Sequence, residues 1–241
     1  AVPFTTPATI GGTTASAADW LAKLNSFASI FGTSGPDVMS GNGLANFFSP
    51  GNGNDTMTAA GGDDLLDGAA GNDSIVSGTG DDTLAGGEGD DWLQGQTEHD
   101  SLDGGNGADT LAGAGGNDTV LGSNGADTLM GGDGDDFIDG QQGNDAIFLG
   151  AGNDVFQWDP GDGSDIVEGG NGTDTMLFNG SAGNEIFAAS ANGGRVTFTR
   201  NLGNIVMDQN NVERVELDAL GGADRFDIGD LRATDIRELS I

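Results

Sequence analysis

The stretch GGDGDDFID (131–139) is the clearest copy of a nine-residue unit that repeats through the middle of this chain. The same frame runs without insertion from Asp37 to Asp154, for example in GGEGDDWLQ (86–94) and GGNGADTLA (104–112). Each copy combines a glycine-rich stretch with one apolar residue at its eighth position. A period this short predicts a parallel β-roll, in which each copy supplies one turn and one short strand.

An aspartate occupies the sixth position of nearly every copy, and Asn46 is the exception. After a two-residue slip beside Trp158 the frame resumes for two further copies. We take the sixth-position carboxylates as candidate metal ligands, because carboxylate oxygens are ligands that hard divalent cations prefer. They are Asp37, Asp55, Asp64, Asp73, Asp82, Asp91, Asp100, Asp109, Asp118, Asp127, Asp136, Asp145, Asp154, Asp165 and Asp174.

The pattern resembles the G-G-x-G-x-D-x-U-x nonapeptides of the RTX, or haemolysin-type, calcium-binding proteins, over roughly residues 32–177. The resemblance implies a right-handed, all-β parallel roll that binds several Ca²⁺ ions. It also implies export by a type I system as an unfolded chain, followed by folding outside the cell, where calcium is plentiful. The C-terminal residues 238–241, an acid followed by a mostly apolar end, are similar to the export tails of such substrates.

Because two copies make one coil, turns eighteen residues apart should stack on the same edge of the roll, about 4.8 Å apart. The sixth-position residues then form two rows, which we call the first and second ladders. The first ladder holds Asp37, Asp55, Asp73, Asp91, Asp109, Asp127, Asp145 and Asp165. The second holds Asn46, Asp64, Asp82, Asp100, Asp118, Asp136, Asp154 and Asp174.

The two ladders differ in their glycines. Every turn of the first ladder has glycine at its fourth position, whereas the second ladder has Leu44 and Glu98 there in two turns. Glycines at the first, second and fourth positions are expected to take positive φ and turn carbonyls inward. The hypothesis is that the first ladder fills completely and that the second has gaps at the pairs 46/64, 82/100 and 100/118.

Stacked carboxylates about 5 Å apart repel each other by roughly 3 kcal/mol per pair at an effective dielectric constant near 20. One apolar residue per copy makes a thin core that is not expected to outweigh this repulsion and the ordering entropy. Calcium binding should therefore be coupled to folding. The alternative is a roll whose turns close without ions, and magnesium is disfavoured because it demands tighter octahedral geometry.

Composition narrows the range of partners. The formal net charge is −32, which favours cations and argues against nucleic acid and anionic membrane surfaces. The chain has no cysteine and hence no disulfide or thiolate site. No apolar run is long enough to span a bilayer, and no signal peptide is visible.

The regions that flank the roll (32–177) differ from it in composition. Residues 1–31 are interpreted as an extended lead-in followed by a capping helix at 16–30, which either packs as a lid on the first coil or binds a partner or membrane. Residues 178–241, the C-terminal cap, are expected to be β-rich, with a hairpin of 195–200 and 205–208, a strand at 212–217 and a turn plus strand at 221–231. All six arginines lie in this cap and are expected to pair with local acids.

Outward positions are mostly polar, but Ala112, Met130 and Phe148 form an apolar file on one sheet. We expect either the C-terminal segment or a second protomer to cover this file. The single histidine, His99, is interpreted as an exposed turn residue, and no nucleophile elbow, zinc motif or phosphate-binding loop is present. The chain is therefore not expected to be an enzyme.

The function predicted is that of a secreted, calcium-dependent structural, surface or matrix protein, such as a component of a biofilm matrix. Self-assembly is plausible because a roll has open strand edges at its ends. One alternative is the secretion and folding module of a larger RTX enzyme, such as a protease, lipase or alginate epimerase. Another is a carbohydrate-binding module that uses a face of the roll to bind extracellular polysaccharide.

Overall fold

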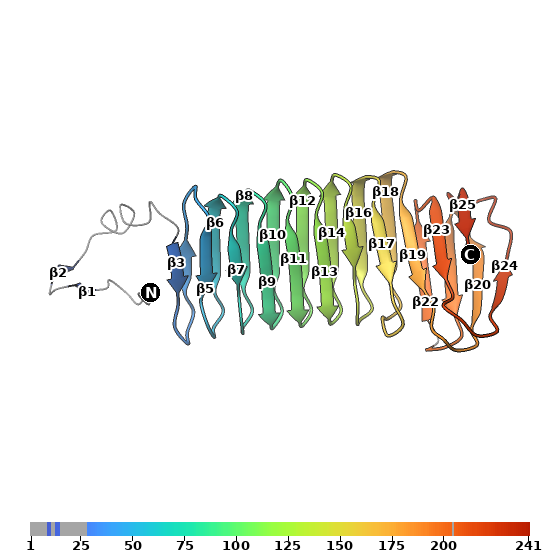
Figure 1. Ribbon diagram of the computed structural model, residues 1–241, viewed down its shortest axis with the longest axis horizontal. Coiled ribbons are helices and arrows are strands. Elements are labelled where there is room, and N and C mark those ends of the chain that lie inside the picture. Colours follow the sequence, from blue (N-terminus) through green and yellow to red (C-terminus); the bar gives the residue numbers. More distant parts are fainter. Residues whose placement is uncertain (1–8, 11–12, 15–27, 204) are drawn as a thin grey trace.

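Two long sheets lie face to face along the molecule in a computed structural model that describes residues 9–10, 13–14, 28–203 and 205–241. Figure 1 shows the strands of the roll, through β19 (Thr175–Asn179), following one another along the long axis in sequence order, with the cap strands at the far end in a different order. Within the described residues every regular element is a strand. The predicted all-β parallel roll is thereby confirmed.

One sheet has twelve strands. Its strands, in chain order, are β4 (Val38–Ser40), β6 (Thr56–Gly61), β8 (Ser74–Thr79), β10 (Trp92–Thr97), β12 (Thr110–Gly115), β14 (Thr128–Asp133), β16 (Ala146–Gly152), β18 (Ile166–Gly172), β20 (Ile186–Asn192), β21 (Arg195–Arg200), β22 (Ile205–Asn210) and β24 (Arg225–Ile228). Through β16 its strands pair in parallel between residues eighteen apart, such as Leu93 with Leu111. This register confirms that two copies make one coil.

The other sheet has eleven strands. They are β3 (Ala28–Phe31), β5 (Asn46–Ser49), β7 (Leu65–Asp67), β9 (Thr83–Glu88), β11 (Ser101–Asn106), β13 (Thr119–Asn124), β15 (Phe137–Asp139), β17 (Val155–Trp158), β19 (Thr175–Asn179), β23 (Arg214–Asp218) and β25 (Glu238–Ser240). Apart from the two sheets, β1 (Thr9–Ile10) pairs antiparallel with β2 (Thr13–Thr14).

The eighth-position side chains form the core between the sheets, as the period predicts. From Met39 to Met176 they are buried, and most have no exposed surface at all. The members are Met39, Phe48, Met57, Leu66, Ile75, Leu84, Leu93, Leu102, Leu111, Val120, Leu129, Ile138, Ile147, Phe156, Val167 and Met176. Since a strand alternates its side chains, the seventh and ninth positions face outward.

Positive φ angles occur at the second and fourth positions of the turns, for example at Gly105 (100°) and Gly107 (143°). The expectation that first-position glycines such as Gly104 share this conformation is wrong, because they do not have positive φ. Their role is spatial and concerns the ladders, as described below. Some second positions carry a side chain in the left-handed region, among them Ala60, Gln96 and Ala114.

Replacing Ala114 with glycine is expected to stabilise the roll by about 1 kcal/mol, because Ala114 has φ of 85° and a Cβ there is strained. Urea unfolding in saturating calcium measures the change. Ala112→Gly in the same strand is the control and should destabilise by roughly 0.5–1 kcal/mol, since glycine in a strand loses more entropy. Equal effects of the two substitutions would contradict the strain at Ala114.

At the N-terminal end, the predicted helix over 16–30 is wrong for its last residues. Ala28–Phe31 form strand β3, which pairs in parallel with β5 and places Ile30 beside Phe48. Ile30 is buried and Phe31 contacts Phe47 edge to face, so strand alternation on the first coil replaces the helical face. The remainder of the predicted helix and the lead-in before Thr9 lie outside the described residues.

The C-terminal cap continues both sheets. The predicted hairpin is present as β21 and β22, which pair antiparallel with Arg200 opposite Ile205, and the two later strands appear as β23 and β24. Each of the six arginines is paired with an acid, as expected. The pairs are Arg195 with Glu168 and Asp208, Arg200 with Glu185, Arg214 with Glu238, Arg225 with Asp227, Arg232 with Asp230, and Arg237 with Asp235.

The apolar file is confirmed as a row, because Ala112 pairs with Met130 and Met130 with Phe148 in register. The expectation that the C-terminal segment covers it is wrong, since that segment extends the roll lengthwise and leaves Phe148 45% exposed. Coverage by a second protomer stays a prediction. No helix among the described residues has the length and apolar character needed to cross a membrane.

Candidate metal centre

The sixth-position residues form two continuous rows, one on each edge of the roll. In each row the backbone N–H of one residue donates to the Oδ1 of the aspartate one coil further on, for example Asp91 to Asp109 and Asp109 to Asp127, both at 2.8 Å. The second ladder follows the same rule, from Asn46 to Asp64 through Asp154 to Asp174. The structure therefore places every predicted ligand in the expected row.

The second carboxylate oxygen of these residues has a different environment. From Asp55 to Asp174, each Oδ2 is buried and has no hydrogen-bond partner. An uncompensated buried carboxylate oxygen is costly, because it has lost its water and gained nothing in exchange. A cation bound beside each row of such oxygens would offset this cost.

Backbone carbonyls converge on the same points. A Cβ added at Gly104, a first-position glycine, would lie 2.6 Å from Asp109 Oδ2 and 2.9 Å from the carbonyl oxygen of Gly122 in the next coil. The same arrangement recurs at Gly68, Gly86 and Gly122. We call each such space, bounded by an aspartate Oδ2 and a carbonyl of the next coil, a cradle. At these turns a Cβ would enter the cradle, so glycine at the first position keeps the cradle open.

The electrostatics of the ion-free ladders are unfavourable at neutral pH. The pKa of Asp127 is raised to about 7, mainly by burial; the N–H of Asp109 opposes this shift, and the charges of Asp145 and Asp109 add to it. Burial likewise raises the pKa of Asp165 to about 8. A raised folded-state pKa contributes stability at acidic pH that is lost as pH rises through these values. A bound cation removes this penalty.

The donor set fits calcium. Each cradle offers hard oxygen donors from carboxylates and carbonyls, which suit an ion that accepts irregular coordination. Within the described residues no three His, Cys, Asp or Glu side chains converge on one point, which disfavours a site built from side chains alone. Here the carbonyls supply the remaining donors, and calcium would supply the charge that balances the two rows.

The turns at which gaps are predicted in the second ladder differ in how far they depart from the ladder geometry. Glu98 adopts φ of 74° and so reproduces the turn that glycine makes elsewhere. Asp100 keeps its ladder bonds on both sides, from Asp82 at 2.9 Å and to Asp118 at 2.8 Å. Glu98 therefore leaves the turn geometry intact. Asn46 differs because it is uncharged: its Oδ1 faces the cradle, 2.1 Å from a Cβ added at Gly41, and its buried Nδ2 has no acceptor.

Sequence reasoning missed the first-position departures. Ser77 occupies a cradle and is fully buried, and its hydroxyl donates to the carbonyl oxygen of Gly95 at 2.8 Å, which engages a donor of the 82/100 site. Ala59 and Leu149 also replace first-position glycine in the second ladder, as Pro50 and Pro160 do in the first. The repeat frame shows these substitutions in the sequence. Their effect on the metal sites is seen only in the structure, where the first position faces the cradle.

His99 belongs to a further row, formed by the fifth-position side chains. This row lies outside the second ladder, on the same edge of the roll. The backbone N–H of His99 donates to Asp81 Oδ1, and its Nδ1 accepts from the N–H of Asn117 at 2.8 Å. Asn117 and Asp135 continue this row. His99 is exposed, as expected, and its ring serves the stacking of turns.

Replacing Gly113 with alanine is expected to remove calcium from one cradle, because the new Cβ would lie 2.2 Å from Asp118 Oδ2. The midpoint of calcium-induced folding should rise several-fold, and the ion count by native mass spectrometry should fall. Gly115→Ala is the matched control in the same strand, since its nearest neighbour would be Gln96 O at 3.6 Å. A midpoint in Gly113→Ala equal to that of the control would refute the cradle.

The fold and the ladders define a class of protein, a parallel β-roll whose turns are built to hold cations between stacked coils. A comparison with protein-family models matches the RTX calcium-binding nonapeptide repeat in four copies, at residues 49–84, 85–120, 121–156 and 161–176. These copies cover more than half of the chain, and the chain therefore belongs to the RTX calcium-binding repeat family. No curated protein matches the chain.

Proposed function

We propose that this protein is a secreted, calcium-dependent structural protein of the cell surface or extracellular matrix, which folds when its ladders fill with Ca²⁺. The observation that carries the proposal is the set of buried, unpartnered Oδ2 atoms that runs along both edges. Residues 24–194 contain no lysine or arginine to neutralise them. A chain of this kind is expanded where calcium is scarce and ordered where it is abundant.

Two features support self-assembly as the structural role. Strands β24 and β25 end the two sheets and leave open edges at the C-terminal end of the roll. On the outer face, Phe148 and the neighbouring Ile166 are 45% and 51% exposed, beside the half-buried Met130. Exposed apolar side chains on neighbouring strands of one sheet favour contact with a second copy of the chain.

The experiment is a calcium titration of the full chain, with circular dichroism and multi-angle light scattering recorded together. The proposal expects strand signal and particle mass to rise over the same calcium range. Phe148→Ser should lower the mass without lowering the strand signal. Folding to a stable monomer at high calcium and high protein concentration would contradict the structural role.

The second candidate is the secretion and folding module of a larger RTX enzyme. Its discriminator is the open reading frame, in which a catalytic domain upstream of Ala1 would favour it. A carbohydrate-binding role would appear as calcium-dependent signals on a glycan array. We propose no enzymatic activity for residues 1–241, because the sole histidine serves turn stacking and the acids of the ladders are poised for cations.

A further inference from the structure

The repeat frame returns in the C-terminal cap, where the sequence period is interrupted. GSAGNEIFA (180–188) and ALGGADRFD (219–227) are separated by 39 residues, because the hairpin and β23 lie between them. Their strands β20 and β24 pair in parallel, with Phe187 opposite and stacked on Phe226. The two segments therefore stack as consecutive turns of the roll.

The turn contacts repeat those of the ladders atom by atom. The N–H of Glu185 donates to Asp224 Oδ1 at 2.9 Å, as each ladder residue does to the next. The N–H of Ala223 donates to Asn184 Oδ1 at 2.8 Å, as in the outer row. A Cβ on Gly180 would lie 2.6 Å from Glu185 Oε2, the distance found at Gly104 and Asp109. Glu185 thus stands in the sixth position of a further turn.

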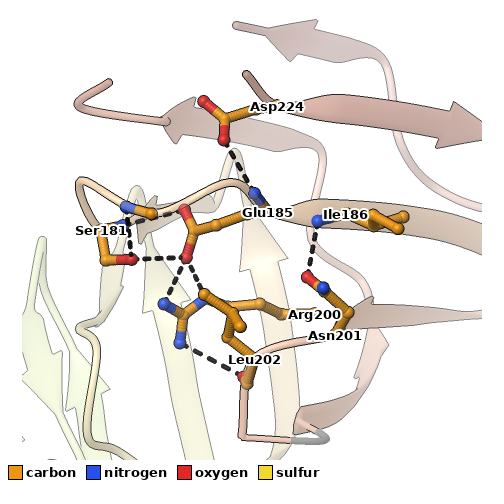
Figure 2. Close-up of polar contacts among 8 residues, drawn as sticks. Ser181, Glu185, Ile186, Arg200, Asn201, Leu202 and Asp224 are labelled. Atoms are coloured by element: carbon orange, nitrogen blue, oxygen red, sulfur yellow. Dashed lines mark hydrogen bonds and ion pairs between the residues drawn. The ribbon is translucent and has the colours of Figure 1, made fainter. Parts of the chain in front are cut away.

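Both carboxylate oxygens of Glu185 have partners, whereas the Oδ2 of each ladder aspartate from Asp55 to Asp174 has none. Ser181 donates to the Glu185 carboxylate through its N–H and its hydroxyl, each at 2.9 Å. Arg200 donates to Oε1 through Nε at 2.6 Å and also through Nη2. Figure 2 shows the guanidinium lying against the carboxylate, with Ser181 beside it and hydrogen-bonded to the same oxygen.

Arg200 is held in place by its own surroundings. It lies on β21, the hairpin strand that pairs with β20, and it is only 7% exposed, whereas Glu185 is 1% exposed. Its Nη1 donates to the carbonyl of Leu202 at 3.4 Å, and its guanidinium lies 5.4 Å from the ring centroid of Trp158. A cation over an aromatic face is stabilised further when water is excluded.

We propose that the Arg200 guanidinium supplies, from within the chain, the positive charge that calcium supplies to the other turns. The turn built on Glu185 and Asp224 is accordingly calcium-independent, and the cap keeps its fold when the ladders are empty. This inference rests on the proposed calcium role of the ladders. Arg200 is then the cation of a further turn, whose sequence departs from the repeat.

Hydrogen exchange with mass spectrometry on the full chain, in EGTA and in calcium, tests the proposal. In EGTA, peptides from 180–230 of the wild type should stay protected, and Arg200→Gln should reduce that protection about a hundredfold, because a buried carboxylate loses its cation. Arg195→Gln, on the same strand but paired at the surface, is the matched control and should have little effect. Arg200→Gln combined with Glu185→Gln should recover most of the protection, because it removes the uncompensated charge.

The proposal is overturned if the wild-type cap exchanges freely in EGTA, if Arg200→Gln behaves like Arg195→Gln, or if the double variant is no better protected than the single. Peptides from 56–176 report separately on the proposed function. Were those peptides equally protected with and without calcium, the calcium role of the ladders would fail, whatever the cap shows.

Discussion

Chelating calcium with EGTA is expected to abolish the strand structure of residues 32–177. The ladders bury fourteen carboxylates with an unpartnered oxygen, from Asp55 to Asp174. Roughly 3 kcal/mol of repulsion per neighbouring pair, summed along two edges, exceeds the 5–15 kcal/mol by which a typical domain is stable. The magnitude of the repulsion therefore decides the outcome, and the ion-free roll should be expanded.

Far-UV circular dichroism and small-angle scattering measure this change. Adding calcium back should restore both signals, whereas magnesium at equal ionic strength is the control and should not, because it keeps its waters and requires octahedral ligands. A chain that remains compact and strand-rich in excess EGTA, with no bound metal by mass spectrometry, would contradict the prediction.

Replacing Asp109 with asparagine is expected to have the largest effect of any single carboxylate substitution. Asp109 lies in the middle of the first ladder and is 1% exposed, and it links Asp91 to Asp127 through two hydrogen bonds. The amide keeps the volume and one oxygen but removes the negative charge and puts an N–H₂ group in place of the second carboxylate oxygen. Since stacked coils are coupled to their neighbours, the calcium midpoint should rise by about tenfold or more.

The matched control is Asp103→Asn, which removes the same charge from the same coil. Asp103 is exposed on β11 and accepts only from the Ser123 hydroxyl at 2.7 Å. Calcium titration followed by circular dichroism, with the ion count from native mass spectrometry, separates the two variants. Equal midpoints would show that net charge, rather than position in the ladder, governs binding.

Prediction from the sequence succeeded where neighbours in space are a fixed number of residues apart. The pairing of Leu93 with Leu111, the buried eighth positions and the two ladders follow from the period alone, because an eighteen-residue coil places each copy on the one before it. The candidate ligands were located by the same rule. Their individual ion occupancy stays a prediction.

The sequence failed where local pattern and coil position disagree. The apolar spacing before Phe31 favours a helix, but β5 offers a strand edge with which residues 28–31 pair, and tertiary pairing prevails over propensity. The sequence predicts a conformational role for first-position glycine, whereas in the structure this glycine leaves space for the cradle. Two coils form each cradle together, so the sequence of a single turn does not reveal it.

The roll, its thin core and the rows of aspartates can be predicted without a structure, because a strict period specifies every contact between adjacent coils. The way the roll ends depends on the folded chain. Glu185 faces Arg200 and is stacked on Asp224 because a hairpin returns one strand alongside β20 and a longer excursion brings the next turn on top of it. These contacts span insertions of unequal length, so they follow no period in the sequence. The pairing of Arg200 with Glu185 is therefore known only from the folded chain.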